Sequence, residues 1–295
     1  MLTNRLLAVA ASFVLAAGIL VVAAPQRGAA QGGNPRASTV QKVFPSAVRL
    51  QIAAAGEVVR SASGVAFASD GERTYILTNA HVVERGPAWK EPVELRVLVS
   101  GKKGPFEGRV VARGHAPEAD IAVIEVRGAG VPVTPLASDD TLELGEDLVV
   151  IGAPFGKGLS VAAGIVSQVE YDFAENPVVP RVPKSIKTDA AIGYGSSGGG
   201  VFDVPRGHLV GLVEGYRTAR VAFGKDEGYA FDVPMPGETF VAPAAKIRRF
   251  LTEHGLGKLA PASATAAVAP SPASEAGPGA ATVTDVPVIP SAKRM

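Results

Sequence analysis

Three things are scarce in this chain: cysteine, histidine and net charge. It has no cysteine, which excludes disulfide bonds, thiolate zinc sites and a thiol nucleophile. The histidines, at positions 81, 115, 208 and 254, show no HExxH spacing, so we expect neither a catalytic metal nor a cofactor. With 29 basic and 28 acidic residues the net charge is +1, which provides no field to attract nucleic acid, and we expect none as a partner.

The N-terminus has the composition of an export signal. Arg5 precedes an uncharged run at 6–24, and the small residues 28–30 then offer a cleavage site for a signal peptidase. Residues 1–30 are therefore predicted to be a signal peptide or an uncleaved membrane anchor. Either one places the folded part in the periplasm or cell envelope. A short polar linker is expected over 31–39.

Between the ends, apolar runs rich in Val and Ile alternate with Gly, Pro and Asp, which is typical of an all-β fold. Two sets of predicted strands suit two six-stranded antiparallel β-barrels, at about 43–136 and 145–235, followed by a C-terminal helix at 243–254. Together they form one predicted domain over 40–256. Residues 257–295 are rich in Ala and Pro, contain no aromatic residue and are predicted to be a disordered tail. The strands are predicted at 47–54, 63–69, 74–80, 93–99, 106–112 and 121–126, and at 147–152, 159–171, 185–190, 199–204, 208–216 and 229–233.

The most informative stretch is TDAAIGYGSSGGGVFD at 188–203, which places a serine among glycines. A nucleophilic serine needs close backbone approach and at least two N–H donors aimed at the developing oxyanion, and glycine allows both. We therefore predict Ser197 as the nucleophile, with the N–H groups of Gly195 and Ser197 as the oxyanion hole. Taken alone, a glycine cluster between strands is equally typical of a turn.

Two further segments support a catalytic role for Ser197. The apolar run in TYILTNAHVVERG ends in His81, and EADIAVIEV puts Asp120 directly before another apolar strand. Each alone has a structural alternative, a buried histidine or a turn aspartate. Together with Ser197 they give the chain order His, Asp, Ser, which is the order of the triad in chymotrypsin-like folds. His81 and Asp120 fall in the first predicted barrel and Ser197 in the second, so we expect the site in the cleft between them.

These motifs resemble those of chymotrypsin-fold serine proteases of the HtrA (DegP/DegQ/DegS) type, over about residues 40–256. The family's histidine, aspartate and serine motifs match residues 78–82, 120–126 and 188–201. The chain departs from the family pattern at Ser196, where the family has Asn, at Gly193-Tyr194, where it has Asn-Pro, and at Gly200. Added glycine leaves the conformation of the oxyanion loop open. Further matches are IGAPFG at 151–156, GIVSQV at 164–169, HLVGLVEG at 208–215 and GYAFDVP at 228–234.

The resemblance implies a serine endopeptidase of protein quality control, which cleaves unfolded or exposed protein segments through an acyl-enzyme intermediate. It also implies a specificity pocket with Ala191 at its base and Tyr194 nearer its mouth. An uncharged base disfavours Lys and Arg and favours a small or medium apolar side chain. Glu214 lies in the strand that would form a pocket wall, and it is either a specificity residue or a residue that faces solvent or a partner.

Other interpretations stay open. A protease-like module that binds or chaperones proteins without catalysis would keep the barrels and distort the loop at 193–200. An envelope structural protein would use the tail as a spacer towards the cell wall. The family's PDZ domain is not expected, because too few residues follow 256 to form one. The homotrimer that the family implies competes with a monomer.

Overall fold

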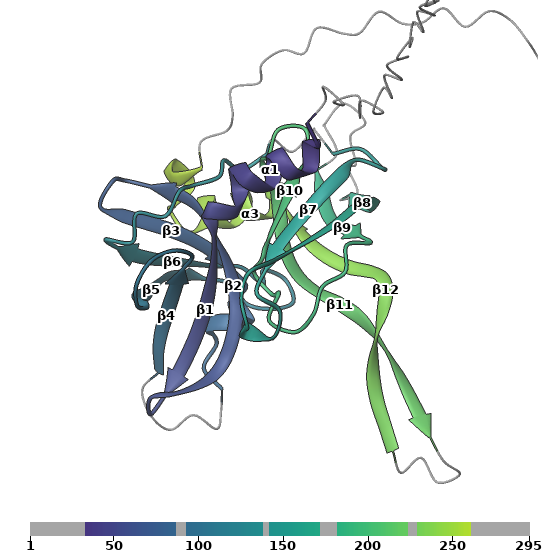
Figure 1. The fold of residues 1–295 in the computed structure, drawn as a ribbon, viewed down its shortest axis with the longest axis horizontal. Helices are drawn as coiled ribbons and strands as arrows, with labels where there is room; N and C mark the ends of the chain where they lie inside the picture. Colours follow the sequence, from purple (N-terminus) through teal and green to yellow (C-terminus); the bar gives the residue numbers. More distant parts are fainter. Residues whose placement is uncertain (1–32, 87–92, 138–141, 172–181, 224–228, 261–295) are drawn as a thin grey trace, which may run out of the picture.

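The two predicted barrels are the main feature of the computed structural model (Figure 1). The predicted signal peptide or anchor at 1–30 lies outside the described residues, and so does the tail predicted over 257–295 except for its first four residues. Those four are ordered, because 257–259 form a short 3₁₀ turn that packs against the end of the C-terminal helix. No helix in the described part is long and apolar enough to cross a membrane. The structure describes residues 33–86, 93–137, 142–171, 182–223 and 229–260.

The first barrel is a closed antiparallel sheet in the order β1-β2-β3-β6-β5-β4. β1 pairs with both β2 and β4 along its length, which closes the barrel. Alternate residues of each strand point inward, so branched apolar side chains such as Leu50, Ile76 and Ile124 fill the interior and are fully buried. The strands are β1 (Ala47–Ala54), β2 (Glu57–Ser69), β3 (Arg73–Thr78), β4 (Val93–Val99), β5 (Phe106–Arg113) and β6 (Ala122–Arg127).

The second barrel repeats this design in the order β10-β11-β12-β9-β8-β7, and the pairing of β10 with β7 closes it. Leu148, Phe202 and Leu212 are among its fully buried side chains. The predicted all-β class with two six-stranded antiparallel barrels and a C-terminal helix is therefore confirmed. The strands are β7 (Asp147–Gly152), β8 (Ser160–Tyr171), β9 (Pro183–Thr188), β10 (Gly200–Asp203), β11 (Leu209–Phe223) and β12 (Tyr229–Pro243).

The last two strands are much longer than predicted, and the second barrel ends at 243 rather than 235. Pro234, Pro236 and Gly237 suggest a strand end, because proline donates no ladder hydrogen bond. In the structure β12 pairs with β11 up to Pro234 and again from Thr239, with a register shift that leaves the residues between them unpaired. Pro236 and Gly237 therefore lie where β12 has no register partner on β11, and Pro236 costs no ladder hydrogen bond. The distal halves of β11 and β12 project from the barrel as a two-stranded arm (Figure 1).

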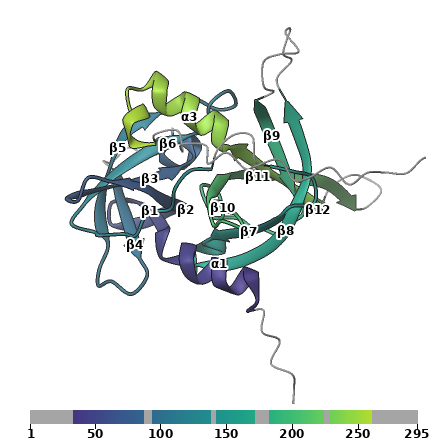
Figure 2. The ribbon, with the colours of Figure 1, turned by 90° about the horizontal axis from the view of Figure 1, so that it is seen from above.

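Two helices cover opposite sides of the molecule (Figure 2). Helix α1 (Pro35–Val43) begins inside the segment predicted as a linker, because the Asn34 side chain accepts hydrogen bonds from the N–H groups of the first turn. Helix α3 (Ala244–Glu253) matches the predicted helix and buries Ile247, Phe250 and Leu251 against the second barrel. The remaining short elements are η1 (Phe44–Ser46), α2 (Ala80–Val83), η2 (Pro154–Gly156) and η3 (Gly257–Leu259).

Candidate active site

His81 and Asp120 meet at one end of the first barrel. β3 ends at Thr78, and the single turn of α2 then carries His81, while Asp120 lies just before β6, which pairs with β3 along its length. The ring nitrogen Nδ1 of His81 lies 2.6 Å from Asp120 Oδ2, and the His81 backbone N–H donates to Asp120 Oδ1 at 2.9 Å. One carboxylate therefore fixes both the backbone and the ring of the histidine.

This contact also keeps Asp120 ionised. Burial alone would raise its pKa, but the hydrogen bonds from the His81 side chain and backbone, together with the electrostatic influence of His81 and Lys246, more than offset burial. The pKa of Asp120 is therefore below its ordinary value. A carboxylate at Nδ1 selects the tautomer with a proton on Nδ1, which leaves Nε2 as a free base.

Two polar side chains, the half-buried Arg60 and the buried Asn79, hold this corner of the barrel, and the sequence analysis singled out neither. Arg60 of β2 donates to the carbonyl oxygens of His81 at 2.5 Å, Val82 at 2.9 Å and Glu84 at 3.0 Å, which fixes the short helix α2. The Asn79 side chain donates to the Asp120 carbonyl at 2.9 Å. Both contacts join a side chain to a distant stretch of backbone, and no local sequence pattern marks them.

Ser197 comes from the second barrel but is held by the first. Its carbonyl oxygen accepts a hydrogen bond from the Ser63 N–H of β2 at 2.9 Å. The next residue, Gly198, packs so closely that a Cβ there would lie 2.2 Å from Thr78 Oγ1. Ser197 thus lies beside the end of the strand that leads to His81. Among the described residues Ser197 Oγ makes no hydrogen bond, so its bond to His81 is not formed here; such bonds often tighten only when substrate binds.

The backbone around Ser197 has the features of an oxyanion hole. Gly195 has φ +91°, and a Cβ there would lie 2.7 Å from the Ala153 carbonyl, so only glycine fits. The Tyr194 carbonyl accepts from the Phe155 N–H at 2.5 Å. In a trans peptide the N–H points opposite to the C=O, so the Gly195 N–H points away from Phe155. Neither this N–H nor that of Ser197 has an acceptor in the described part of the chain.

An apolar cavity of about 420 Å³ adjoins this loop, and no charged side chain lines it. Ala191 and Tyr194, the predicted pocket residues, both line it. Phe155, at its rim, is 68% exposed and has φ +56°, a strained conformation for a residue other than glycine. The Tyr216 hydroxyl is buried without a well-formed hydrogen bond, and burial, with Tyr194 nearby, raises the pKa of Tyr216 to about 12. The cavity therefore offers a mainly apolar wall to a substrate side chain.

Glu214, the third predicted pocket residue, lies elsewhere. It does not line the cavity, and its Oε1 accepts a hydrogen bond from Lys246 Nζ of α3 at 2.8 Å. The Glu214 side chain is 23% exposed and that of Lys246 is 15% exposed. The structure thus gives Glu214 a partner inside the molecule, which neither alternative from the sequence anticipated.

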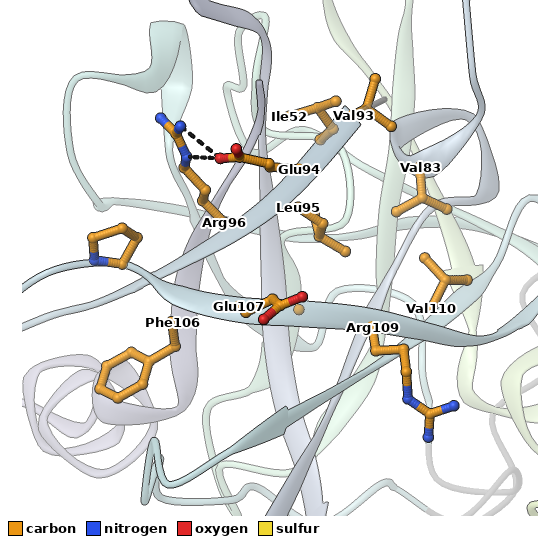
Figure 3. Close-up of a pocket in the computed structure, with 12 residues that line it drawn as sticks. Ile52, Val83, Val93, Glu94, Leu95, Arg96, Phe106, Glu107, Arg109 and Val110 are labelled. Carbon is orange, nitrogen blue, oxygen red and sulfur yellow. Dashed lines mark hydrogen bonds and ion pairs between the residues drawn. The ribbon is translucent and has the colours of Figure 1, made fainter. Parts of the chain in front are cut away.

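A second cavity of about 630 Å³ lies in the first barrel, where β4 and β5 share only two register pairs and then diverge (Figure 3). Leu95 and Val110 line it, and the paired Glu94 and Arg96 lie at its rim. None of the three predicted catalytic residues lines it. In the described ranges no group of three His, Asp or Glu side chains is arranged to hold a metal ion.

Comparison with known proteins shows the family of the chain. The sequence model of the trypsin-like peptidase domain matches residues 62–212, a span that includes all three predicted catalytic residues. The chain belongs to the trypsin-like peptidase family. Within this family it is HtrA-like, as the sequence motifs predict. A relative from Ectopseudomonas mendocina (strain ymp), "Probable periplasmic serine endoprotease DegP-like", is 34% identical over 66% of this chain and 37% of its own length.

Two further known proteins match a larger share of this chain. "Serine protease HTRA1" of Xenopus laevis is 31% identical over 80% of this chain and 49% of its own length. The chain thus spans about half or less of these peptidase relatives. The crystal structure of the serine endoprotease from Yersinia pestis superposes with a TM-score of 0.55 and 23% identity, covering 76% of this chain and 67% of that one, and it supports the fold.

Proposed function

We propose that this trypsin-like peptidase is a serine endopeptidase that uses Ser197, His81 and Asp120 as its catalytic triad. The observation that carries the proposal is the pair of hydrogen bonds by which Asp120 holds the ring and backbone of His81, at 2.6 and 2.9 Å, beside the Ser197 loop. A histidine oriented by a buried carboxylate next to a serine flanked by unpaired N–H donors is the arrangement that acyl transfer requires.

In this mechanism His81 Nε2 takes the proton of Ser197 Oγ while that oxygen attacks the peptide carbonyl carbon. The N–H groups of Gly195 and Ser197 bind the resulting oxyanion. His81 then gives the proton to the leaving amine as the C–N bond breaks, which yields an acyl-enzyme. A water molecule attacks the ester, passes its proton through His81 and releases Ser197. Asp120 stabilises the imidazolium in both halves of the reaction.

The cavity beside the loop supports a preference for apolar side chains. Its wall of Ala191, Ile192 and Tyr194 carries no charge that would bind Lys or Arg. Apolar side chains are exposed mainly in unfolded proteins, so we propose unfolded or exposed protein segments as substrates. The periplasmic relative supports a role outside the cytoplasm, in the periplasm or cell envelope. Anchoring through 1–30 and a homotrimer stay predictions.

Hydrolysis of an unfolded protein tests this function. The wild type should cleave a fluorescently labelled unfolded protein, and Ser197→Ala should abolish cleavage while the melting temperature barely changes. Ser100→Ala, which changes an exposed serine in the turn after β4, is the matched control and should cleave like the wild type. A folded wild type that never cleaves would instead favour the catalytically silent module, and undiminished cleavage by Ser197→Ala would refute Ser197 as the nucleophile.

A further inference from the structure

Ser63 of β2 makes three hydrogen bonds from the first barrel to two loops of the second. Its hydroxyl donates to the Gly195 carbonyl at 2.7 Å and accepts from the Ala153 N–H at 2.8 Å. Its own N–H donates to the Ser197 carbonyl at 2.9 Å. Ser63 is 0% exposed, so these bonds form away from solvent. One side chain therefore joins two loops that are far apart in the sequence.

The surroundings of Ser63 call for a small side chain with a hydroxyl group. A serine hydroxyl can donate to a carbonyl and accept from an N–H at the same time, which no apolar side chain can do. A Cβ on Gly152, the residue before Ala153, would lie 3.2 Å from Ser63 Oγ, so the backbone packs closely around this oxygen. Serine therefore fits both the space and the two backbone partners.

These contacts hold the two peptide planes on either side of Gly195. The plane after Gly195 carries its carbonyl, which Ser63 Oγ holds directly. The plane before it carries the Gly195 N–H, and the carbonyl of this plane, from Tyr194, accepts from the Phe155 N–H at 2.5 Å. Phe155 lies in the short turn that begins at Ala153, the other partner of Ser63. Since N–H and C=O point in opposite directions in a trans peptide, a fixed carbonyl also sets the direction of the N–H.

We propose that Ser63 is a positioning residue for the oxyanion hole, whose hydroxyl joins the Ala153 turn to Gly195 and so keeps the Gly195 N–H aimed at the developing oxyanion. This role rests on the proposed function, in which that N–H binds the oxyanion. Ser63 touches no reacting atom, and it acts through the backbone of Ala153 and Gly195. The first barrel thus supplies the histidine base and also orients a donor of the second barrel.

Ser63→Ala removes the hydroxyl and keeps the Cβ. It leaves the Gly195 carbonyl and the Ala153 N–H without their partner in a buried place, so both loops should move. Oxyanion donors stabilise the transition state more than the bound substrate. We therefore expect kcat to fall about 10- to 100-fold, while KM stays within about threefold of the wild type.

Ser46→Ala is the matched control. Ser46 is also buried, at 1% exposure, and its hydroxyl also makes two hydrogen bonds, to the Val43 carbonyl at 2.7 Å and from Thr134 Oγ1 at 2.9 Å. None of these three residues belongs to the candidate site. Ser46→Ala should therefore lower the melting temperature by an amount similar to that of Ser63→Ala and leave both kcat and KM unchanged.

Steady-state kinetics on a peptide substrate, with a thermal melt of each variant, measure this difference. Amide hydrogen exchange at Ala153, followed by NMR in the full chain, is a second readout that needs no turnover. The Ala153 amide should exchange faster in Ser63→Ala than in the wild type or in Ser46→Ala, because it has lost its acceptor. Ser63→Cys offers only a weak donor and acceptor, so it should also lower kcat, and it replaces Ser63→Ala if that variant does not fold.

A wild type that cleaves, with a kcat of Ser63→Ala within about twofold of that of Ser46→Ala, would overturn the proposal and leave the proposed function standing. A rise in KM at unchanged kcat would also overturn it, because the side chain would then support substrate binding alone. So would a fall in kcat without faster exchange at Ala153, since the hydroxyl would not act through that turn. A folded wild type that cleaves nothing would refute the proposed function, and the positioning role would fail with it.

Discussion

The two barrels contribute to the candidate site in different ways. The first supplies His81 and Asp120, which side-chain hydrogen bonds hold in place. The second supplies Ser197 from a loop whose conformation depends on backbone contacts and on glycines at positive φ, Gly195 at +91° and Gly198 at +77°. The base is therefore oriented by charge and the nucleophile by close packing. Substitutions in the two halves should therefore reduce activity for different physical reasons.

The largest loss of stability and activity should come from removing helix α3, which packs against the second barrel. Ending the chain after Pro243 removes Ile247, Phe250 and Leu251, all essentially fully buried, at about 1.5–3 kcal/mol each. That is a large share of the stability of a typical domain, so we expect unfolding of the second barrel and loss of all activity. Ending the chain after Ala260 is the matched control, and it should keep both activity and melting temperature. Loss of structure in both truncations, followed by circular dichroism, would show that the tail belongs to the fold.

The charge-oriented half is tested by Asp120→Asn. An amide at Nδ1 can stabilise the wrong tautomer and cannot stabilise the imidazolium, so kcat should fall on the order of 10⁴-fold. The melting temperature should change little, because the two partners on His81 can still be hydrogen-bonded. Steady-state kinetics on a peptide substrate measure the loss. A decrease of less than about tenfold would show that Asp120 does not orient the base.

The packing-oriented half is tested by Gly198→Ala. The new Cβ would lie 2.2 Å from Thr78 Oγ1 and 2.4 Å from the Ser63 carbonyl, so the Ser197 loop must move away from the first barrel. A displacement of about 1 Å can reduce kcat/KM about 100-fold. Gly56→Ala is the matched control: Gly56 also has positive φ, at +85°, but nothing lies within 4 Å of its Cβ position. It should cost about 1–2 kcal/mol of stability and leave activity unchanged. Equal activity losses in both variants would contradict the packing argument.

The smallest predicted change is a loss of folding stability at low pH. The pKa of Asp120 is lowered in the folded state, so its contribution to stability is complete above the unfolded value of about 4 and is lost as pH falls through the folded value. As the pH falls below about 4, the wild type should therefore lose more stability than Asp120→Asn. Urea unfolding at each pH measures the difference. Parallel losses would show that the His81 contact does not favour the ionised form of Asp120.

Sequence patterns predicted the first barrel better than the second. β1 and β4 begin and end at the predicted residues, because their alternating Val, Leu and Ile side chains report directly on a buried face. The arm of β11 and β12 escaped prediction, because Pro236 and Gly237 look like a strand end, and only the register shift against β11 shows that these two residues lie in an unpaired stretch within β12.

The candidate site was also predicted only in part. The sequence motifs predicted His81, Asp120 and the serine loop, because acyl transfer needs those groups in that order. Arg60, which holds the carbonyl groups of α2, escaped prediction. Its partners are far away in the chain, and a charged residue within a strand is usually a solvated one, so only the three-dimensional structure identifies this role.

The central claim is that His81 of the first barrel activates Ser197 of the second barrel as a nucleophile. The most direct test is labelling with a fluorophosphonate probe followed by peptide mapping. We predict one covalent adduct on Ser197 of the folded, processed wild type, no adduct in Ser197→Ala and a strongly slowed reaction in His81→Ala, in which the base is missing. Absence of labelling in folded wild-type protein, or an adduct on a different serine, would contradict the account.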